Sequence, residues 1–338
     1  MSTLKEIAKR ARVSYSTVSR ALNGNESISV ETRQRIVKIA EKMNYLPNKA
    51  AQMLVDRKRS RPAVSTLIGV VYSAGLPLND YYFSMVIKSI VDEASLDGFS
   101  TFISPVAAGY DGIMGLARRL REHFMTGLIL VGNIDEKTIP AIREYCPNSV
   151  IVDKPMADLA SVYNDNEGGA FEAVSYLIRA GCRRIALIRG QAGHYFTRAT
   201  QKGYRRALAE AGIPYDEDLC AQGEFHVQSG FDAMQELLSR GVRPDGVFSN
   251  DEMAVGAVRA LRTAGIDVPR QVMVFGFDNL ALAELVEPPL STVKVNYEYM
   301  ARTAVRKVIE NSRTGKIVPV EIIIPVELVI RESTRRSA

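Results

Sequence analysis

From Leu67 onwards, short apolar runs alternate with segments whose apolar residues recur at helical spacing. Apolar runs of this length, bounded by turn residues, are typical of strands buried on both faces. The predicted strands are Leu67–Tyr72, Phe99–Ser104, Gly127–Val131, Ser149–Val152, Arg184–Arg189, Gly246–Ser249 and Val272–Phe277, with a last one beginning at Glu327. Strands and helices that alternate in this way predict an α/β fold with parallel sheets and crossover helices.

The length of 338 residues, of which 46% are hydrophobic, suits two or three domains with a large core. No apolar stretch is long enough to span a membrane, and the amino terminus is polar rather than signal-like. We therefore expect a cytoplasmic protein without a membrane partner. Cys146, Cys182 and Cys220 are widely spaced and lack nearby ligand residues, so we expect buried thiols rather than a metal site.

The charge is distributed unevenly along the chain. Residues 1–61 contain fourteen lysines and arginines against five acidic residues, a net charge of +9. The remainder carries a net charge of −4. A small basic segment attached to a mildly acidic body indicates a module that binds a polyanion, such as nucleic acid, joined to a separate globular unit.

The basic segment itself shows three stretches of helical periodicity. Thr3 and Glu6 form a capping-box pattern at the start of the first, Ser14 is placed to cap the second, and Ser29 is placed to cap the third. Two short helices joined by a tight turn and closed by a third predict an all-α helix-turn-helix domain. Tyr15, Ser16 and Arg20 fall on the outer face of the second helix, where they suit either base edges in a major groove or a protein contact.

A proline-started helical segment follows Tyr45, and residues 56–62 form a charged linker. A helix this short is marginal in water, so we expect it to order against DNA or a second copy of itself. The sequences VSYSTVSR at 13–20, NYLPN at 44–48 and AQxL at 51–54 resemble the head of the LacI/GalR family of bacterial transcriptional regulators. The resemblance continues through the whole chain.

The resemblance implies a domain organisation. It consists of a helix-turn-helix domain at residues 1–47, a hinge helix and linker at 48–64, and an effector-binding and dimerisation domain at 65–338. The last domain would be a periplasmic-binding-protein-like body of two parallel-sheet subdomains around a cleft, joined by three crossings of the chain. The first subdomain would span about 65–163 with 295–325, and the second about 164–294.

The resemblance also implies which residues contact DNA. Leu54 of the hinge helix would wedge between the central base pairs in the minor groove, where an apolar side chain unstacks a step for a few kcal/mol. Packing within the linker is the alternative role for Leu54. The expected DNA-binding residues are Thr3, Ser14, Tyr15, Ser16, Thr17, Arg20, Asn23, Tyr45, Asn48, Ala51 and Leu54.

Ligands of open α/β sheets bind beyond the carboxyl ends of the strands. Asp153, Asn250 and Asp278 directly follow or end apolar strands, and their carboxylates and amides can bind hydroxyl groups. Each of these residues serves equally well as a helix cap. Asp251 opens a helix, so Asn250 is the better candidate for the cleft.

Three aromatic residues are added to the expected effector site by the resemblance. Tyr82 and Phe83 occupy the place of the family's Asn-Pro-Phe-Phe stretch, and Phe225 matches an aromatic residue that packs on the effector; core packing is the alternative for each. The chain departs from the family in lacking that proline and in having Thr200 where an arginine commonly clasps the ligand. Arg198 is a candidate to replace that arginine.

The sequence contains no phosphate-binding loop, dinucleotide fingerprint or catalytic motif, so we expect neither a cofactor nor an enzyme. The three histidines are isolated and are expected at the surface or in the cleft. The family's apolar tetramerisation helix is not found after Glu327, so we expect a homodimer that binds a palindromic operator.

The expected function is a regulator, most often a repressor, whose operator affinity depends on a small molecule, with a sugar favoured over a nucleobase or phosphosugar. A second hypothesis replaces the small molecule by a phosphorylated protein that binds Arg302 and Arg306, although an ordinary solvated helix face explains these arginines equally well. A third hypothesis is a sugar-binding protein that does not bind DNA, but it leaves the basic segment unexplained.

Overall fold

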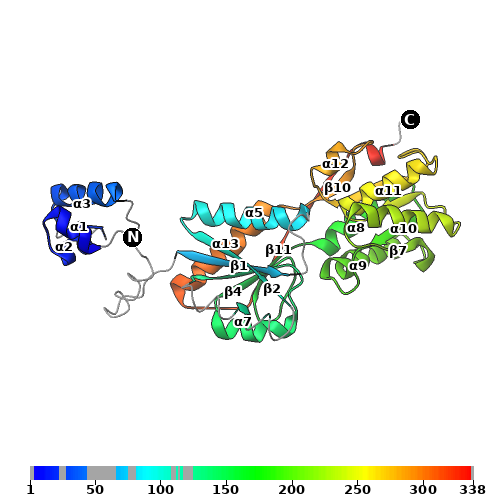
Figure 1. Cartoon of the computed structure of the whole chain (residues 1–338). Helices are drawn as coiled ribbons and strands as arrows, with labels where there is room; N and C mark the ends of the chain where they lie inside the picture. The colour runs from blue at the N-terminus through cyan, green and yellow to red at the C-terminus, as the bar shows by residue number, and fades with distance from the viewer. Residues whose placement is uncertain are drawn as a thin grey trace. The chain divides into compact units, whose positions relative to one another are not determined.

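The computed structural model describes residues 4–22, 28–43, 66–74, 81–107, 112, 115–116 and 125–335. The chain forms two compact units, residues 1–64 and 65–338 (Figure 1). We call the first unit the head and the second the body. Each is described by itself.

The head contains helices α1 (Leu4–Ala11), α2 (Tyr15–Leu22) and α3 (Val30–Lys42). Ser14 Oγ accepts a hydrogen bond from the Thr17 amide at 3.1 Å, which caps α2 as predicted. Ser29 Oγ likewise accepts from the Thr32 amide at 3.3 Å and caps α3. The three helices enclose a small core made of Ile7, Ala8, Ala11, Val18, Ala21, Ile36 and Ala40. The predicted helix-turn-helix domain is confirmed.

The first sheet of the body is six-stranded and parallel throughout. Its strands, in sheet order, are β11 (Glu321–Ile324), β5 (Ala160–Asn164), β4 (Ser149–Val152), β3 (Gly127–Val131), β1 (Leu67–Ser73) and β2 (Ser100–Val106). Helices α5 (Tyr81–Leu96) and α13 (Tyr297–Thr314) lie side by side on one face, although they are far apart in sequence (Figure 1). On the other face lie η1 (Glu136–Thr138) and α7 (Ile139–Tyr145).

The second sheet also has six strands, and only β12 runs antiparallel to its neighbour. In sheet order its strands are β12 (Glu327–Val329), β10 (Ser291–Lys294), β9 (Met273–Asp278), β8 (Gly246–Phe248), β6 (Ile185–Arg189) and β7 (Cys220–Gln222). One face is covered by α8 (Asn166–Arg179) and α9 (Tyr195–Glu210), and the other by α10 (Val227–Ser239) and α11 (Asp251–Thr263). The short elements are η2 (Glu217–Leu219), α12 (Leu282–Leu285) and η3 (Glu332–Thr334).

The chain passes between the two sheets three times: after β5, between β10 and α13, and between β11 and β12. Because β12 pairs with β10, the second subdomain contains the last strand as well as the region between β5 and α13. The expected range of 164–294 for this subdomain therefore leaves out a strand that the structure includes. The predicted α/β fold of two parallel-sheet subdomains is confirmed.

None of the described helices is both long enough and apolar enough to cross a membrane. The described part of the chain also contains no group of histidine, cysteine and acidic side chains that suits a metal ion.

Asp251 anchors the second sheet from its position at the start of α11. Its fully buried carboxylate accepts hydrogen bonds from the Leu280 amide at 2.7 Å and from Thr292 Oγ1 at 2.6 Å. Gly276 in β9 packs against it so closely that an added Cβ would lie 2.1 Å from Asp251 Oδ1. The carboxylate therefore ties α11, β9, β10 and the loop after β9 together.

Asp251→Ala is expected to destabilise the body by about 2 to 4 kcal/mol, because it leaves the buried Leu280 amide and Thr292 hydroxyl without their acceptor. Asp232→Ala, at an exposed position in α10, is the control and should change the free energy of unfolding by less than about 0.5 kcal/mol. Urea unfolding measures both. Equal effects of the two substitutions would contradict the assigned role of Asp251.

The pH dependence of stability tests the same group. Burial raises the pKa of Asp251 to about 7, against the lowering effect of its hydrogen bonds to Thr292 and Leu280. The folded state then holds a proton that the unfolded state has lost, so stability should fall as the pH rises from about 4 to about 7, by at most about 1.4 kcal/mol per pH unit. Asp251→Asn removes the titration and should flatten this part of the stability curve. Parallel curves for the two proteins would show that Asp251 does not titrate in this window.

Candidate functional site

A cavity lies in the body where residues from both subdomains meet, and the space in and immediately outside its opening amounts to about 400 Å³. From the first subdomain come the start of α5 and the residue after β4. From the second come the residues that follow β6, β7 and β8 and the end of β9. The nine lining residues are Tyr82, Phe83, Asp153, His194, Phe196, Phe225, Asn250, Glu252 and Asp278. The lining residues other than those of α5 therefore lie at or beyond the carboxyl ends of parallel strands, where ligands of open α/β sheets bind.

The backbone at this cavity is strained at three lining residues. Asp153, Phe225 and Asp278 have φ angles of 76°, 65° and 112°, in a region that residues other than glycine seldom occupy. Such conformations cost about 1 to 3 kcal/mol each and persist where the surrounding structure enforces them, which is common at ligand sites. All three strained backbone positions belong to residues that line the cavity.

Tyr82 connects the start of α5 to the residue after β4, within the first subdomain. Its hydroxyl donates a hydrogen bond to Asp153 Oδ1. Burial raises the pKa of Tyr82 well above its ordinary value, and the negative charges of Asp153 and Asp278 raise it further. The phenol therefore remains a hydrogen-bond donor at neutral pH.

Tyr297 on α13 links the two subdomains beside the cavity. Its hydroxyl donates to the backbone carbonyl of Asp278 in the second sheet at 3.2 Å. Its ring packs edge-on against Tyr82, with centroids 5.5 Å apart. This contact joins the side chains of the first subdomain to the strained end of β9.

An aromatic wall forms the second subdomain's side of the cavity. Phe225 meets His194 and Phe196 edge-on, at centroid distances of 5.1 and 5.8 Å, and Phe196 in turn packs on Phe277 at 5.1 Å. Burial lowers the pKa of His194 to about 4, helped by the nearby charges of Lys154 and Arg198. His194 is therefore a neutral member of this wall, and its Nδ1 accepts a hydrogen bond from the Phe196 amide at 3.3 Å.

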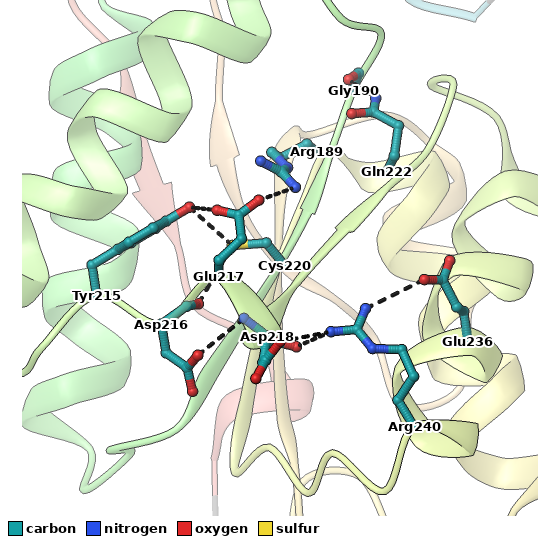
Figure 2. Close-up of polar contacts among 10 residues, drawn as sticks. All are labelled: Arg189, Gly190, Tyr215, Asp216, Glu217, Asp218, Cys220, Gln222, Glu236 and Arg240. Atoms are coloured by element: carbon teal, nitrogen blue, oxygen red, sulfur yellow. Dashed lines mark hydrogen bonds and ion pairs between the residues drawn. The ribbon is translucent and has the colours of Figure 1, made fainter.

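Phe225 is held against Gly190, the residue after β6. A Cβ at Gly190 would lie 1.9 Å from Phe225 Cε1, so only glycine leaves room for the ring. Figure 2 shows the Gln222 amide directed at the Gly190 carbonyl, to which it donates a hydrogen bond; it also donates to the Gly223 carbonyl at 2.9 Å. These contacts bring the segments after β6 and β7 together beneath the ring.

Polar contacts farther from the cavity also hold the segments around β6 and β7 in place. Arg189 Nη2 donates to Glu217 Oε1 at 2.8 Å, and the Tyr215 hydroxyl donates to the other oxygen of this carboxylate (Figure 2). Arg240, the C-cap residue of α10, donates to the Asp218 carbonyl at 2.9 Å. These contacts hold η2, the turn that leads into the edge strand β7.

Asn250 combines the two roles that the sequence left open. Its Oδ1 accepts a hydrogen bond from the Met253 amide at 3.2 Å and caps α11, and the residue also lines the cavity. Asp251 lies behind it, committed to Leu280 and Thr292. Phe83 is likewise both a member of the core and a lining residue.

Six of the seven expected effector residues line the cavity, and Arg198 does not. Its guanidinium donates instead to the Gly193 carbonyl. Thr200, at the position of the family's usual arginine, donates to the Phe196 carbonyl at 2.8 Å and so stays bonded to its own helix. His194 agrees with the expectation of a histidine at the surface or in the cleft, although the sequence analysis did not name it as an effector residue. The sequence analysis missed Phe196 and Glu252; Glu252 lies close behind β8, whereas Phe196 lies within α9, seven residues beyond β6.

The expected DNA contacts lie partly within the described residues. Tyr15, which is 54% exposed, Ser16 and Arg20 lie on the outer face of α2, and Ser14 bonds to Ser16 Oγ at 2.7 Å. Thr17 is half-buried. Outside the described residues lie Thr3, Asn23, Tyr45, Asn48, Ala51 and Leu54.

The arginines considered for a phosphorylated partner differ in their surroundings. Arg302 makes a two-pronged ion pair with Glu93, with both N–O distances at 3.0 Å. Arg306 is exposed on the same helix. Because Arg302 is engaged within the body, the structure does not favour this pair as a phosphate site.

Comparison with known proteins places these features in a family. Residues 3–48 match the model of bacterial regulatory proteins of the lacI family, and residues 174–334 match the periplasmic binding protein-like domain. The chain is 31% identical to the probable HTH-type transcriptional repressor ExuR of Bacillus subtilis, over 99% of both chains. It is 32% identical to the HTH-type transcriptional regulator CelR of Thermobifida fusca, over 98% of both.

Solved structures agree. The lac repressor dimer bound to operator and the anti-inducer ONPF has a TM-score of 0.88 at 28% identity, over 98% of this chain and 99% of that one. The complex of the regulator CelR with cellobiose has a TM-score of 0.73 at 29% identity, over 98% of this chain and 100% of that one. Full-length similarity to transcriptional regulators at above 30% identity, with matching head and body, shows that the chain belongs to the lacI family of bacterial regulatory proteins.

Proposed function

We propose that this protein is a transcriptional repressor that binds a palindromic operator as a homodimer and is controlled by a carbohydrate bound in the cavity of its body. The observation that carries this function is the cavity itself, because its lining comes from both subdomains of a body attached to a helix-turn-helix head. Among the similar proteins, one solved structure is a lac repressor dimer on its operator, and another is the regulator CelR with cellobiose.

The cavity is suited to controlling operator affinity because a ligand in it contacts both subdomains. A ligand changes a conformational equilibrium only if it binds one state better than the other. A molecule that bridges Asp153 and Asp278 would gain contacts from each subdomain only at one particular separation of the two. We infer that ligand binding selects one arrangement of the subdomains and that operator affinity follows this selection.

For the head, we propose that α2 reads the operator through Tyr15, Ser16 and Arg20, which are exposed on it. The division into residues 1–47, 48–64 and 65–338, with a hinge helix that carries Leu54, is part of this proposal. So are the roles of the other expected DNA contacts. A protein that acts on chromosomal DNA works in the cytoplasm, and we propose that it acts by binding rather than by catalysis.

Arg20→Ala should weaken operator binding about 10- to 100-fold and remove the base preference at one position of each half-site, because an arginine can pair bidentately with guanine. The operator is first found by selecting bound duplexes from a random pool and sequencing them. Arg35→Ala, at an exposed position in α3, is the control. It should leave the base preference intact, even if affinity falls uniformly. An unchanged preference in both variants would contradict the role of α2.

Gly190→Ala should lower effector affinity at least about 10-fold, because the new methyl group displaces the Phe225 ring from the cavity wall and misplaced contact groups lose affinity steeply. Operator binding without effector should be retained. Gly246→Ala is the control, since its Cβ would meet its neighbours at 3.2 Å or more and away from the cavity. Titration of the effector by calorimetry measures the difference. Equal affinities for the parent protein and Gly190→Ala would contradict the role of Phe225.

A further inference from the structure

His194 lies at the start of α9 and lines the cavity, where it is 9% exposed. Its Nδ1 accepts a hydrogen bond from the Phe196 amide at 3.3 Å and thereby caps the helix. An imidazole nitrogen that accepts a hydrogen bond carries no proton, so the proton of the neutral ring is on Nε2. Burial keeps the ring neutral at physiological pH, because it lowers the pKa of His194 to about 4. The contact with Phe196 therefore makes Nε2 a hydrogen-bond donor.

This donor is available to a ligand. Nε2 of His194 makes no hydrogen bond to any residue that the structure describes. It is also not one of the buried side-chain atoms of these residues that lack a partner, so solvent reaches it. A ligand that displaces this solvent must offer an acceptor to the N–H group, because an unpaired donor in a buried site costs binding free energy.

Capping alone does not account for a histidine at this position. A helix N-cap needs only one acceptor, which serine, threonine, aspartate or asparagine supplies with a shorter side chain. His226 caps α10 in the same way, since its Nδ1 accepts from the Ser229 amide at 3.1 Å. His226 is exposed, however, and is not one of the described lining residues of the cavity. The two histidines share the capping contact, and of the two only His194 can also contact a ligand there.

The aromatic neighbours of His194 indicate the kind of ligand group that it suits. Phe225 meets the His194 ring edge-on at a centroid distance of 5.1 Å, and Phe196 lies 5.8 Å from Phe225. Aromatic rings offer apolar surface on which the C–H groups of a sugar ring can pack. The N–H group of His194 needs an oxygen with a free lone pair. Together they suit a ring with an apolar face and hydroxyl oxygens at its edge, which is the form of a pyranose.

We propose that His194 is a specificity-determining residue of the cavity, whose Nε2–H donates a hydrogen bond to one hydroxyl oxygen of a carbohydrate that packs on Phe225. This inference rests on the proposed function of the cavity. Because Nε2–H donates and does not accept, it recognises the lone pair of that oxygen. A site that pairs with a ligand oxygen discriminates strongly against the analogue that lacks it, since the donor is then left unpaired.

The test begins with a sugar that binds. Calorimetry of the full chain with D-glucose, D-galactose, D-mannose, D-xylose, L-arabinose, cellobiose, maltose and lactose identifies the tightest binder. Its monodeoxy analogues, each of which lacks one hydroxyl oxygen, then show which oxygens contribute to affinity. Removal of the oxygen that His194 contacts should weaken binding to the parent protein at least about 10-fold, because Nε2–H loses its acceptor.

His194→Asn identifies the contact. Asparagine keeps an oxygen that can cap α9 but lacks Nε2, so this variant should bind the sugar about 10-fold more weakly than the parent protein does. It should also reduce the loss caused by that one deoxy substitution to less than about 3-fold, because the two changes remove the same contact. His226→Asn makes the matched change at the cap of α10 and should retain both values of the parent protein. Thermal unfolding checks that both variants fold.

Two results would overturn the proposal, and they are distinguishable. If every deoxy substitution causes the same loss in His194→Asn as in the parent protein, His194 donates to none of these oxygens, and the proposed function still stands. If the parent protein binds no sugar of the panel, both the role of His194 and the proposed carbohydrate control are wrong.

Discussion

Parallel strands bring the residues that follow them to one edge of the sheet, and this constraint organises the whole body. The residues after β4 and β6–β8, with the end of β9, meet in one cavity although they are spread over more than a hundred residues of sequence. The three crossings between the sheets bring the two sets of strand ends together. A ligand placed there contacts both subdomains, so its affinity depends on how the two subdomains are arranged.

Contacts behind the cavity keep its lining in place. Asp251 holds the loop after β9 through the Leu280 amide, and Arg331 donates to the side chain of Asn279 in the same loop at 2.9 Å. On the opposite side of the cavity, Gly190 leaves room for the Phe225 ring because it has no side chain. These supports explain how Asp278 and Phe225 persist at positive φ. A lining held in this way loses little conformational entropy when a ligand binds, which favours affinity.

The sequence pattern predicted strands that are mainly apolar. It missed strands that contain buried polar residues, that are very short or that lie at a sheet edge. Strand β5 contains Ser161 and Asn164, buried polar residues that break the apolar pattern, and β7 is only three residues long. Strand β11 lies at a sheet edge and exposes Ile323, so its apolar residues do not mark it as a buried strand. The rule that ligands bind beyond the carboxyl ends of parallel strands identified Asn250 and Asp278 as candidates. It could not predict that Arg198 bonds to Gly193, since that depends on how α9 begins after His194.

The central claim is that a carbohydrate in the body and an operator at the head are linked. The most direct test measures operator affinity with and without a saturating sugar, and sugar affinity with and without a saturating operator. Linkage requires the two affinities to change by the same factor, and we expect that factor to be at least about 5-fold. A sugar that binds in the cavity but leaves operator affinity unchanged would contradict the account.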